Sequence, residues 1–145
     1  METKKKIGEL LIEAGKIREE DLAKALEKQK TTGKKLGEIL IQMGNLTEED
    51  LTVSLATQFQ CPFLKIENYD ISKDTIALIP KGLALKYQCI PLDKIGDIIS
   101  FVICDPGTLQ ELKQLEAFLN CKVQFFVTTP SSMKETLKKY YGEST

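Results

Sequence analysis

A duplication near the N-terminus constrains this chain more than any other feature. The segment Lys6–Gln29 aligns without a gap over Lys35–Gln58 at an offset of 29 residues, and 12 of the 24 positions are identical. The identical pairs are Lys6/Lys35, Gly8/Gly37, Glu9/Glu38, Leu11/Leu40, Ile12/Ile41, Gly15/Gly44, Glu19/Glu48, Glu20/Glu49, Asp21/Asp50, Leu22/Leu51, Leu26/Leu55 and Gln29/Gln58. A repeat places the same structural unit twice, so we expect both copies to fold alike and to bury their apolar faces against each other.

Each copy has the pattern of a helical hairpin. In the first copy, Lys6–Ala14 carries apolar residues at helical spacing, and Gly15 stands where a helix ends in the left-handed conformation. A second helix is predicted from about Arg18, with three acidic residues in its first turn. The segment Lys30–Lys34 is expected to connect the two copies. Residues 1–62 are therefore predicted to form an all-helical subdomain.

The second copy has the stronger helix-start signal. Thr47 is placed to cap the second helix of this copy with its hydroxyl, and Asp50 is placed to return the contact to the backbone of Thr47. The Cys61-Pro62 step is expected to close the helical region, because the residue before a proline is disfavoured in a helix.

A different pattern begins at Phe63. Two strands are expected around a turn at Lys94–Asp97, a third at Lys122–Val127, and a last helix at Pro130–Tyr141. Further helices are expected at Ser72–Ile79, Pro80–Tyr87 and Thr108–Leu119, and a short extended piece at Phe63–Ile66. The predicted class is α+β: two helical hairpins, then a small unit over residues 63–145 with about three strands and helices on one side.

Composition narrows the function classes. The chain has 145 residues, 42% hydrophobic and 28% charged, with a net charge of -1. This balance gives no general attraction to a nucleic acid polymer or to an anionic membrane. No apolar run is long enough to span a bilayer and no signal peptide is visible, so a cytoplasmic location without direct membrane insertion is expected. The four cysteines are widely spaced, and we interpret them as buried free thiols.

The sequence shows no catalytic constellation. There is no phosphate-binding loop with its lysine and hydroxyl, no histidine to act as a general base, and no nucleophile motif. We therefore predict that the chain is not an enzyme and that it holds neither a metal nor a resident cofactor.

Two glycines and two glutamines recur in the repeat. Gly8 and Gly37 fall early in a helix, where glycine costs about 1 kcal/mol relative to alanine. Either close helix–helix packing or the close approach of an anionic ligand explains them, and the residues alone favour neither. Gln29 and Gln58 are ordinary exposed helix residues or, at the end of a leucine face, amide groups for a nucleobase edge or a phosphate.

The duplicated pattern resembles a known family. The motif RLGxxLxxxGxLxxxxLxxxLxxQ, given twice with a five-residue spacer, is similar to the MshEN domain. That domain forms the N-terminal part of type II secretion ATPases (general secretory pathway protein E) and of type IV pilus assembly ATPases in bacteria. Ile79-Pro80, Asp105-Pro106 and Thr129-Pro130 extend the resemblance through the second half. The resemblance implies binding of cyclic di-GMP and a regulatory role.

Carried over residue by residue, the resemblance implies a ligand site from both copies and one aspartate. The positions are Lys6, Ile7, Gly8, Leu11, Leu22, Leu26 and Gln29, then Lys35, Leu36, Gly37, Leu40, Leu51, Leu55 and Gln58, and finally Asp105. One departure is notable: the leading arginine of the family is lysine in both copies. Lysine lacks the planar fork that arginine offers to a guanine edge or a phosphate.

Two functions follow from different classes. In the first, the chain senses cyclic di-GMP and regulates a secretion or pilus ATPase domain, in cis or in trans. In the second, the same helices dock the ATPase to an inner-membrane assembly protein without binding a ligand. The repeated glycine and glutamine favour sensing, and the two lysines favour docking.

Overall fold

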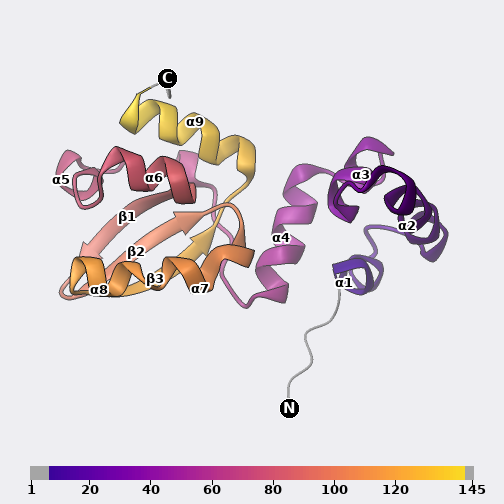
Figure 1. Cartoon of the computed structure of the whole chain (residues 1–145), viewed down its shortest axis with the longest axis horizontal. Helices are drawn as coiled ribbons and strands as arrows, with labels where there is room; N and C mark the ends of the chain where they lie inside the picture. The colour runs from indigo at the N-terminus through magenta and orange to yellow at the C-terminus, as the bar shows by residue number, and fades with distance from the viewer. Residues whose placement is uncertain (1–6, 143–145) are drawn as a thin grey trace, which may run out of the picture. The chain divides into compact units, whose positions relative to one another are not determined.

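The chain divides into two compact units. The structure, a computed structural model, describes residues 7–142. Its units are Met1–Gln60 and Cys61–Thr145. The first is helical and the second carries a sheet (Figure 1), which is the predicted α+β class.

The first unit contains four helices that repeat one plan. They are α1 (Ile7–Glu13), α2 (Glu19–Thr32), α3 (Leu36–Gln42) and α4 (Glu48–Gln58). Helix α1 packs against α4, and α2 packs against α3. Helix α1 is equivalent to α3 in the repeat, and α4 is equivalent to α2. Exchanging each helix for its equivalent turns one of these contacts into the other, so the two copies have an approximate two-fold relation. No strand occurs between residues 7 and 60.

Backbone geometry follows the sequence signals. Gly15 and Gly44 have φ values of 75° and 81°, the left-handed conformation expected after the first helix of each copy. The connector between the copies is shorter than predicted, because α2 continues to Thr32 and ends at Gly33, with φ 70°. The hydroxyls of Thr31 and Thr32 donate to the carbonyl of Lys28 at 3.0 and 2.8 Å, so this last turn stays helical.

Apolar residues from both copies form one core in this unit. Leu11 and Leu40, which are equivalent in the repeat, are completely buried. They pack in a cluster with Ile17, Ala25, Ile39 and Leu46. Burying a leucine side chain contributes about 1.5–3 kcal/mol. One hairpin alone has no partner for this face, so the duplication itself stabilises the unit.

The predicted cap of α4 is present. Thr47 Oγ1 accepts from the backbone N–H of Asp50 at 3.0 Å, and Asp50 Oδ2 accepts from the N–H of Thr47 at 3.4 Å. Asp50 also pairs with Lys16 of the first copy at 3.1 Å. The hydrogen bond from Thr47, followed by that from Lys16, lowers the pKa of the Asp50 carboxyl below its usual value.

Removing this cap gives a testable loss of stability. We expect Thr47→Ala to cost about 1 kcal/mol, because it leaves an orphan backbone donor at the start of α4. Because the pKa of Asp50 is lower when folded, its contribution is present above the unfolded pKa and is lost as pH falls through the folded value. Denaturant melts of Asp50→Asn and the parent should therefore differ at pH 7 and converge in strong acid. Arg18→Ala is the control for Thr47→Ala, because Arg18 holds the equivalent position in the first copy. An equal loss of stability in Arg18→Ala would contradict the assignment of a cap to the Thr47 hydroxyl.

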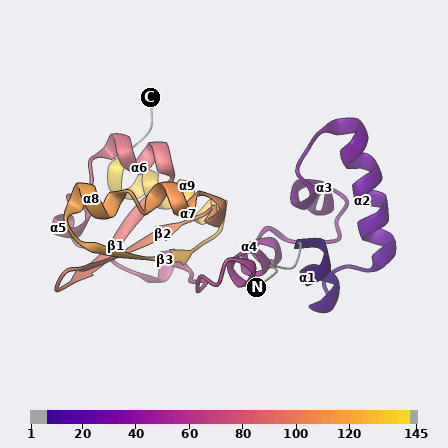
Figure 2. The same ribbon diagram turned by 60° about the horizontal axis from the view of Figure 1, so that its bottom comes forward.

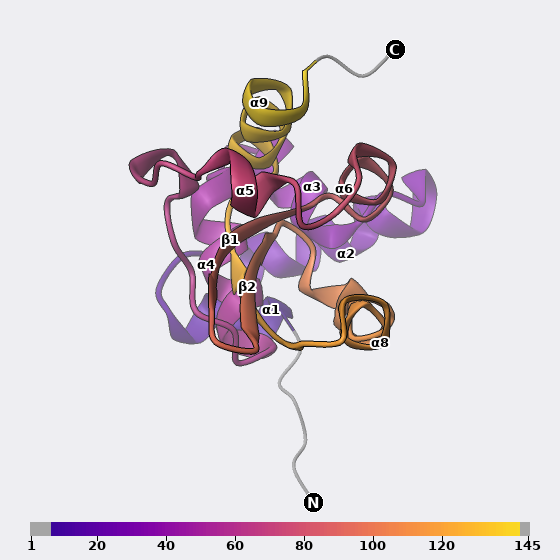
Figure 3. The same ribbon diagram turned by 90° about the vertical axis from the view of Figure 1, so that its left-hand side faces the viewer.

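The second unit combines short helices with three strands. Its elements are η1 (Ile66–Asn68), α5 (Lys73–Ile76), α6 (Lys81–Tyr87), β1 (Cys89–Ile95), β2 (Ile98–Ile103), η2 (Pro106–Thr108), α7 (Leu109–Leu112), α8 (Leu115–Leu119), β3 (Lys122–Val127) and α9 (Pro130–Tyr141). Helices α6 and α8 lie on the same side of the sheet (Figures 2 and 3). Helix α9 packs against η1 and α6.

The sheet has the order β1-β2-β3. Strands β1 and β2 form the predicted antiparallel hairpin, with Ile95 opposite Ile98 across the turn. Strand β3 runs parallel to β2, and the connection through η2, α7 and α8 supplies the crossover that parallel pairing requires. The rings of Phe101 and Phe125 stack with centroids 6.2 Å apart in the core of this unit.

Two predicted helices are shorter in the structure. The helix expected over Thr108–Leu119 is divided into α7 and α8, because the Gln114 and Glu116 amides bond three residues back, at 3.2 and 3.1 Å, in a tighter turn. Helix α5 covers only the first half of Ser72–Ile79, where Leu78 likewise bonds to Thr75 at 3.0 Å before Pro80. The spacing of apolar residues along the sequence suits a continuous helix as well as short helices joined by a tighter turn, so it did not separate the two.

Candidate functional site

The structure explains the repeated glycines by packing within each copy. A Cβ atom on Gly8 would lie 2.8 Å from Leu22 Cδ1, and one on Gly37 would lie 2.5 Å from Leu51 Cδ2. Real Cβ atoms essentially never make contacts this short, so the leucine would have to shift. Glycine therefore lets the leucine of the second helix rest directly on the first helix. Of the two explanations left open by the sequence, close helix packing is the one with a direct contact here.

The leucines of the repeat fall into two groups. Leu11 and Leu40 have no exposed surface, so their part in any site is to support other residues from below. The leucines of the second helices are accessible: Leu26 is 41% exposed, and Leu22, Leu51 and Leu55 are partly exposed. The accessible apolar surface therefore belongs to α2 and α4.

The polar members of the motif lie at the ends of these faces. Gln29 and Gln58 are partly exposed, near the ends of α2 and α4. Lys35 is exposed and directly precedes α3, and Leu36 is partly exposed. Ile7 is the first residue of α1 and is also partly exposed. Lys6, which is equivalent to Lys35 in the first copy, lies outside the described residues. Each copy thus presents apolar surface beside an amide, and the second copy adds a cation.

Asp105 belongs to the second unit and has a local structural role. Its Oδ1 accepts from the amide of Gly107 at 3.0 Å, and its backbone carbonyl accepts from the Thr108 hydroxyl at 2.9 Å. These bonds shape the turn after β2 and start η2. The side chain is exposed, so it keeps acceptor capacity for another partner.

Buried ionisable groups are few and not arranged for acid–base chemistry. Burial raises the pKa of the Cys89 thiol to about 12, and burial also raises the pKa of Tyr141 to about 12. Both groups stay protonated at neutral pH. Cys89 is the buried thiol, whereas Cys61, Cys104 and Cys121 are only partly buried, so the prediction of four buried thiols is wrong for three. Residues 7–142 hold no cluster of metal-ligating side chains and no helix able to cross a membrane.

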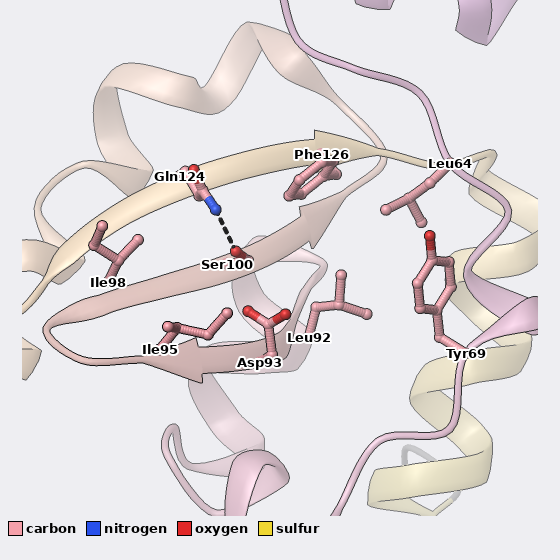
Figure 4. A pocket seen from close by; sticks show the side chains of 9 residues that line it. All are labelled: Leu64, Tyr69, Leu92, Asp93, Ile95, Ile98, Ser100, Gln124 and Phe126. Atoms are coloured by element: carbon pink, nitrogen blue, oxygen red, sulfur yellow. Dashed lines mark hydrogen bonds between the residues drawn. The ribbon is translucent and has the colours of Figure 1, made fainter.

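A second surface lies on the sheet face of the second unit and was not predicted. It is a hollow of about 350 Å³ lined by Leu64, Tyr69, Leu92, Asp93, Ile95, Ile98, Ser100, Gln124 and Phe126 (Figure 4). Gln124 Nε2 donates to Ser100 Oγ at 2.6 Å in its centre. Ile98 and Ser100 are two residues apart on β2, and Gln124 and Phe126 are two residues apart on β3, so each pair lies on one face of its strand. This two-residue spacing is the sequence signal that could have found the face. Its polar centre is already hydrogen-bonded, and the lining forms no acid–base pair.

These features define a class of protein module. Two helical hairpins with duplicated motifs precede a small unit with a mixed three-stranded sheet, and the accessible apolar surface lies on the second helix of each hairpin. A family model for the MshEN domain matches residues 59–145, more than half of the chain. The chain belongs to the MshEN domain family, as its motifs predicted.

Solved structures extend the likeness over both units. The structure of MshE with cdg is 29% identical, has a TM-score of 0.83, and covers 94% of this chain and 99% of its own. The N-terminal domain of XpsE is 17% identical with a TM-score of 0.72, covering 98% of this chain and 100% of its own, and supports the fold alone.

Two curated relatives are type IV pilus assembly ATPases named PilB. The protein from Myxococcus xanthus is 29% identical over 138 residues, and the protein from Thermus thermophilus is 28% identical over 141 residues. The alignments cover 95% and 96% of this chain. The chain spans only 24% of the first relative and 16% of the second.

Proposed function

We propose that this chain is a non-catalytic module that binds cyclic di-GMP across its two motifs. The observation that carries the proposal is the duplicated surface: accessible leucines on α2 and α4, each followed by a glutamine. Apolar side chains suit the flat face of a base, and an amide both donates to and accepts from its edge. Two such surfaces with an approximate two-fold relation suit a ligand with two bases and two phosphates. The likeness to MshE, solved with cdg, supports the same ligand.

We further propose that binding regulates a type II secretion or type IV pilus assembly ATPase. The PilB relatives support this context, because they are pilus assembly ATPases and align with nearly the whole of this chain. This chain corresponds to about a quarter or less of their length, which leaves the rest of such a protein to hydrolyse ATP. In this proposal the chain supplies regulation in the cytoplasm, while another domain, in cis or in trans, hydrolyses ATP. The alternative is that the same helices contact an inner-membrane assembly protein. A chain that does not bind cyclic di-GMP would favour this alternative.

Restoring the family arginine is the sharpest test. We expect Lys35→Arg, alone and combined with Lys6→Arg, to raise the affinity for cyclic di-GMP over the parent, most in the double variant. The change adds fork geometry at unchanged charge, so the gain should persist in moderate salt. Calorimetric titration of each variant measures it.

Two controls accompany that titration. Cyclic di-AMP, titrated in parallel, reports whether the guanine edge is read. Lys113 is an exposed lysine of the second unit. Lys113→Arg controls for a lysine-to-arginine change outside the proposed site and should leave the affinity for cyclic di-GMP unchanged. If neither the parent nor the double arginine variant releases heat with cyclic di-GMP, the sensing function is wrong and ligand-free docking replaces it.

A further inference from the structure

The first unit carries two grooves at equivalent places in the repeat. One lies between α1 and α4 and measures about 520 Å³, and the other lies between α2 and α3 and measures about 100 Å³. Four lining positions correspond at the repeat offset: Leu10/Ile39, Glu13/Gln42, Ala14/Met43 and Thr57/Lys28. We call the first the open groove and the second the filled groove. Neither is lined by a residue of the candidate nucleotide site.

Side-chain size explains why the two grooves differ in shape. Met43 in the filled groove stands where the open groove has Ala14. Under this methionine Ile39 is only 3% exposed, whereas its equivalent Leu10 is partly exposed. Val53, also in the open groove, is 41% exposed. The open groove is therefore a large hollow with exposed apolar side chains, and the filled groove is a much smaller hollow.

The two grooves also carry opposite charge. The open groove is lined by three carboxylates, Glu13, Glu49 and Asp50, and one ammonium, Lys16, which gives a net charge of -2. The filled groove is lined by Lys28 and Lys34 without a carboxylate, which gives +2. Both lysines are exposed, and among the described residues neither has a carboxylate partner.

We propose that the open groove of one molecule receives the filled groove of a second copy of this chain. The two surfaces are complementary in charge, and the long stems of Lys28 and Lys34 can cover the exposed apolar side chains while their ammonium groups meet the carboxylates. Each copy has one of each surface, so the contact is head-to-tail and leads to a ring or an open chain of molecules.

The expected association is weak and depends on salt. Exposed ion pairs contribute little individually and are screened within about 8–10 Å at physiological ionic strength. We expect the mass of the full chain in sedimentation experiments to rise with protein concentration at low salt and to fall to that of one copy in about 0.5 M salt.

The repeat itself supplies the variants for a decisive test. Glu13→Gln with Ala14→Met gives the open groove the residues of the filled groove at two of the four corresponding positions, which narrows it and removes one carboxylate. Lys28→Glu with Lys34→Glu reverses the charge of the filled groove. Each double variant keeps one intact surface and should stay monomeric at all concentrations. Mixed together, they should form a pair and stop there, because each pair has no further complementary surface. Lys113→Glu with Lys134→Glu makes the same charge change in the second unit and should associate like the parent.

Three results would overturn the proposal. The first is a parent chain that has the mass of one copy at every concentration in low salt. The second is association that the lysine reversal leaves unchanged. The third is a mixture of the two double variants that stays monomeric although circular dichroism shows both to be folded. Because no variant alters the candidate nucleotide site, cyclic di-GMP binding is measured separately and its failure leaves this test intact.

Discussion

Gln29→Ala and Gln58→Ala are each expected to weaken cyclic di-GMP binding by about 1–3 kcal/mol, roughly 5- to 150-fold. Each substitution removes an amide that can donate to and accept from the ligand, next to an apolar surface that excludes water. Neither glutamine lies in the core, so the free energy of unfolding should change by less than about 0.5 kcal/mol. Calorimetry on both single variants and the double variant measures the loss.

Gln42→Ala provides the matched control for this experiment. Gln42 is an exposed glutamine at the end of α3 in the same unit, outside the proposed site. Its substitution should leave the affinity for the dinucleotide unchanged. If Gln42→Ala weakens binding as much as Gln29→Ala does, the glutamines act through general helix surface and the assigned site is wrong. The double variant should lose more than either single variant, since one amide comes from each copy.

Gly37→Ala is expected to destabilise the first unit, although alanine favours a helix by about 1 kcal/mol over glycine. The new Cβ would lie 2.5 and 2.9 Å from the two terminal carbons of Leu51, and 3.3 Å from its Cγ. Leu51 must therefore turn away, which typically costs about 1–3 kcal/mol in overpacked sites. Because Leu51 belongs to the accessible leucine surface of α4, the same variant should also bind cyclic di-GMP less tightly.

Two other glycines calibrate this effect. In Gly8→Ala the closest contact, with Leu22 Cδ1, is 2.8 Å, so its loss of stability should be smaller than that of Gly37→Ala. Gly82, in α6, has no neighbouring atom within 4 Å, so Gly82→Ala should raise stability by up to about 1 kcal/mol. Urea melts of the three variants give the order. A Gly37→Ala protein as stable as Gly82→Ala would mean that Leu51 moves at no cost.

The sequence was most informative where a signal is local. The capping pair Thr47 and Asp50, the left-handed Gly15 and Gly44, and the start of α9 at Pro130 are each set by a few adjacent residues. These signals predicted the helices of the repeat, and short strand-like runs, two of them around a turn, predicted the three strands. They failed at Thr108–Leu119, because apolar spacing is the same for one continuous helix and for two short helices with a tight turn between them.

The sequence by itself determined the repeat and its four helices, the three strands, the α+β class and the family. Only the tertiary structure decided which of the repeated residues are buried, which are accessible and what they pack against. Gly8 and Gly37 read equally well as ligand contacts or packing positions until the distances to Leu22 and Leu51 were known. The leucines of the motif look alike in sequence, yet Leu40 is buried and Leu26 is accessible. Burial depends on which helix faces which, and that is set by contacts between residues distant in the chain.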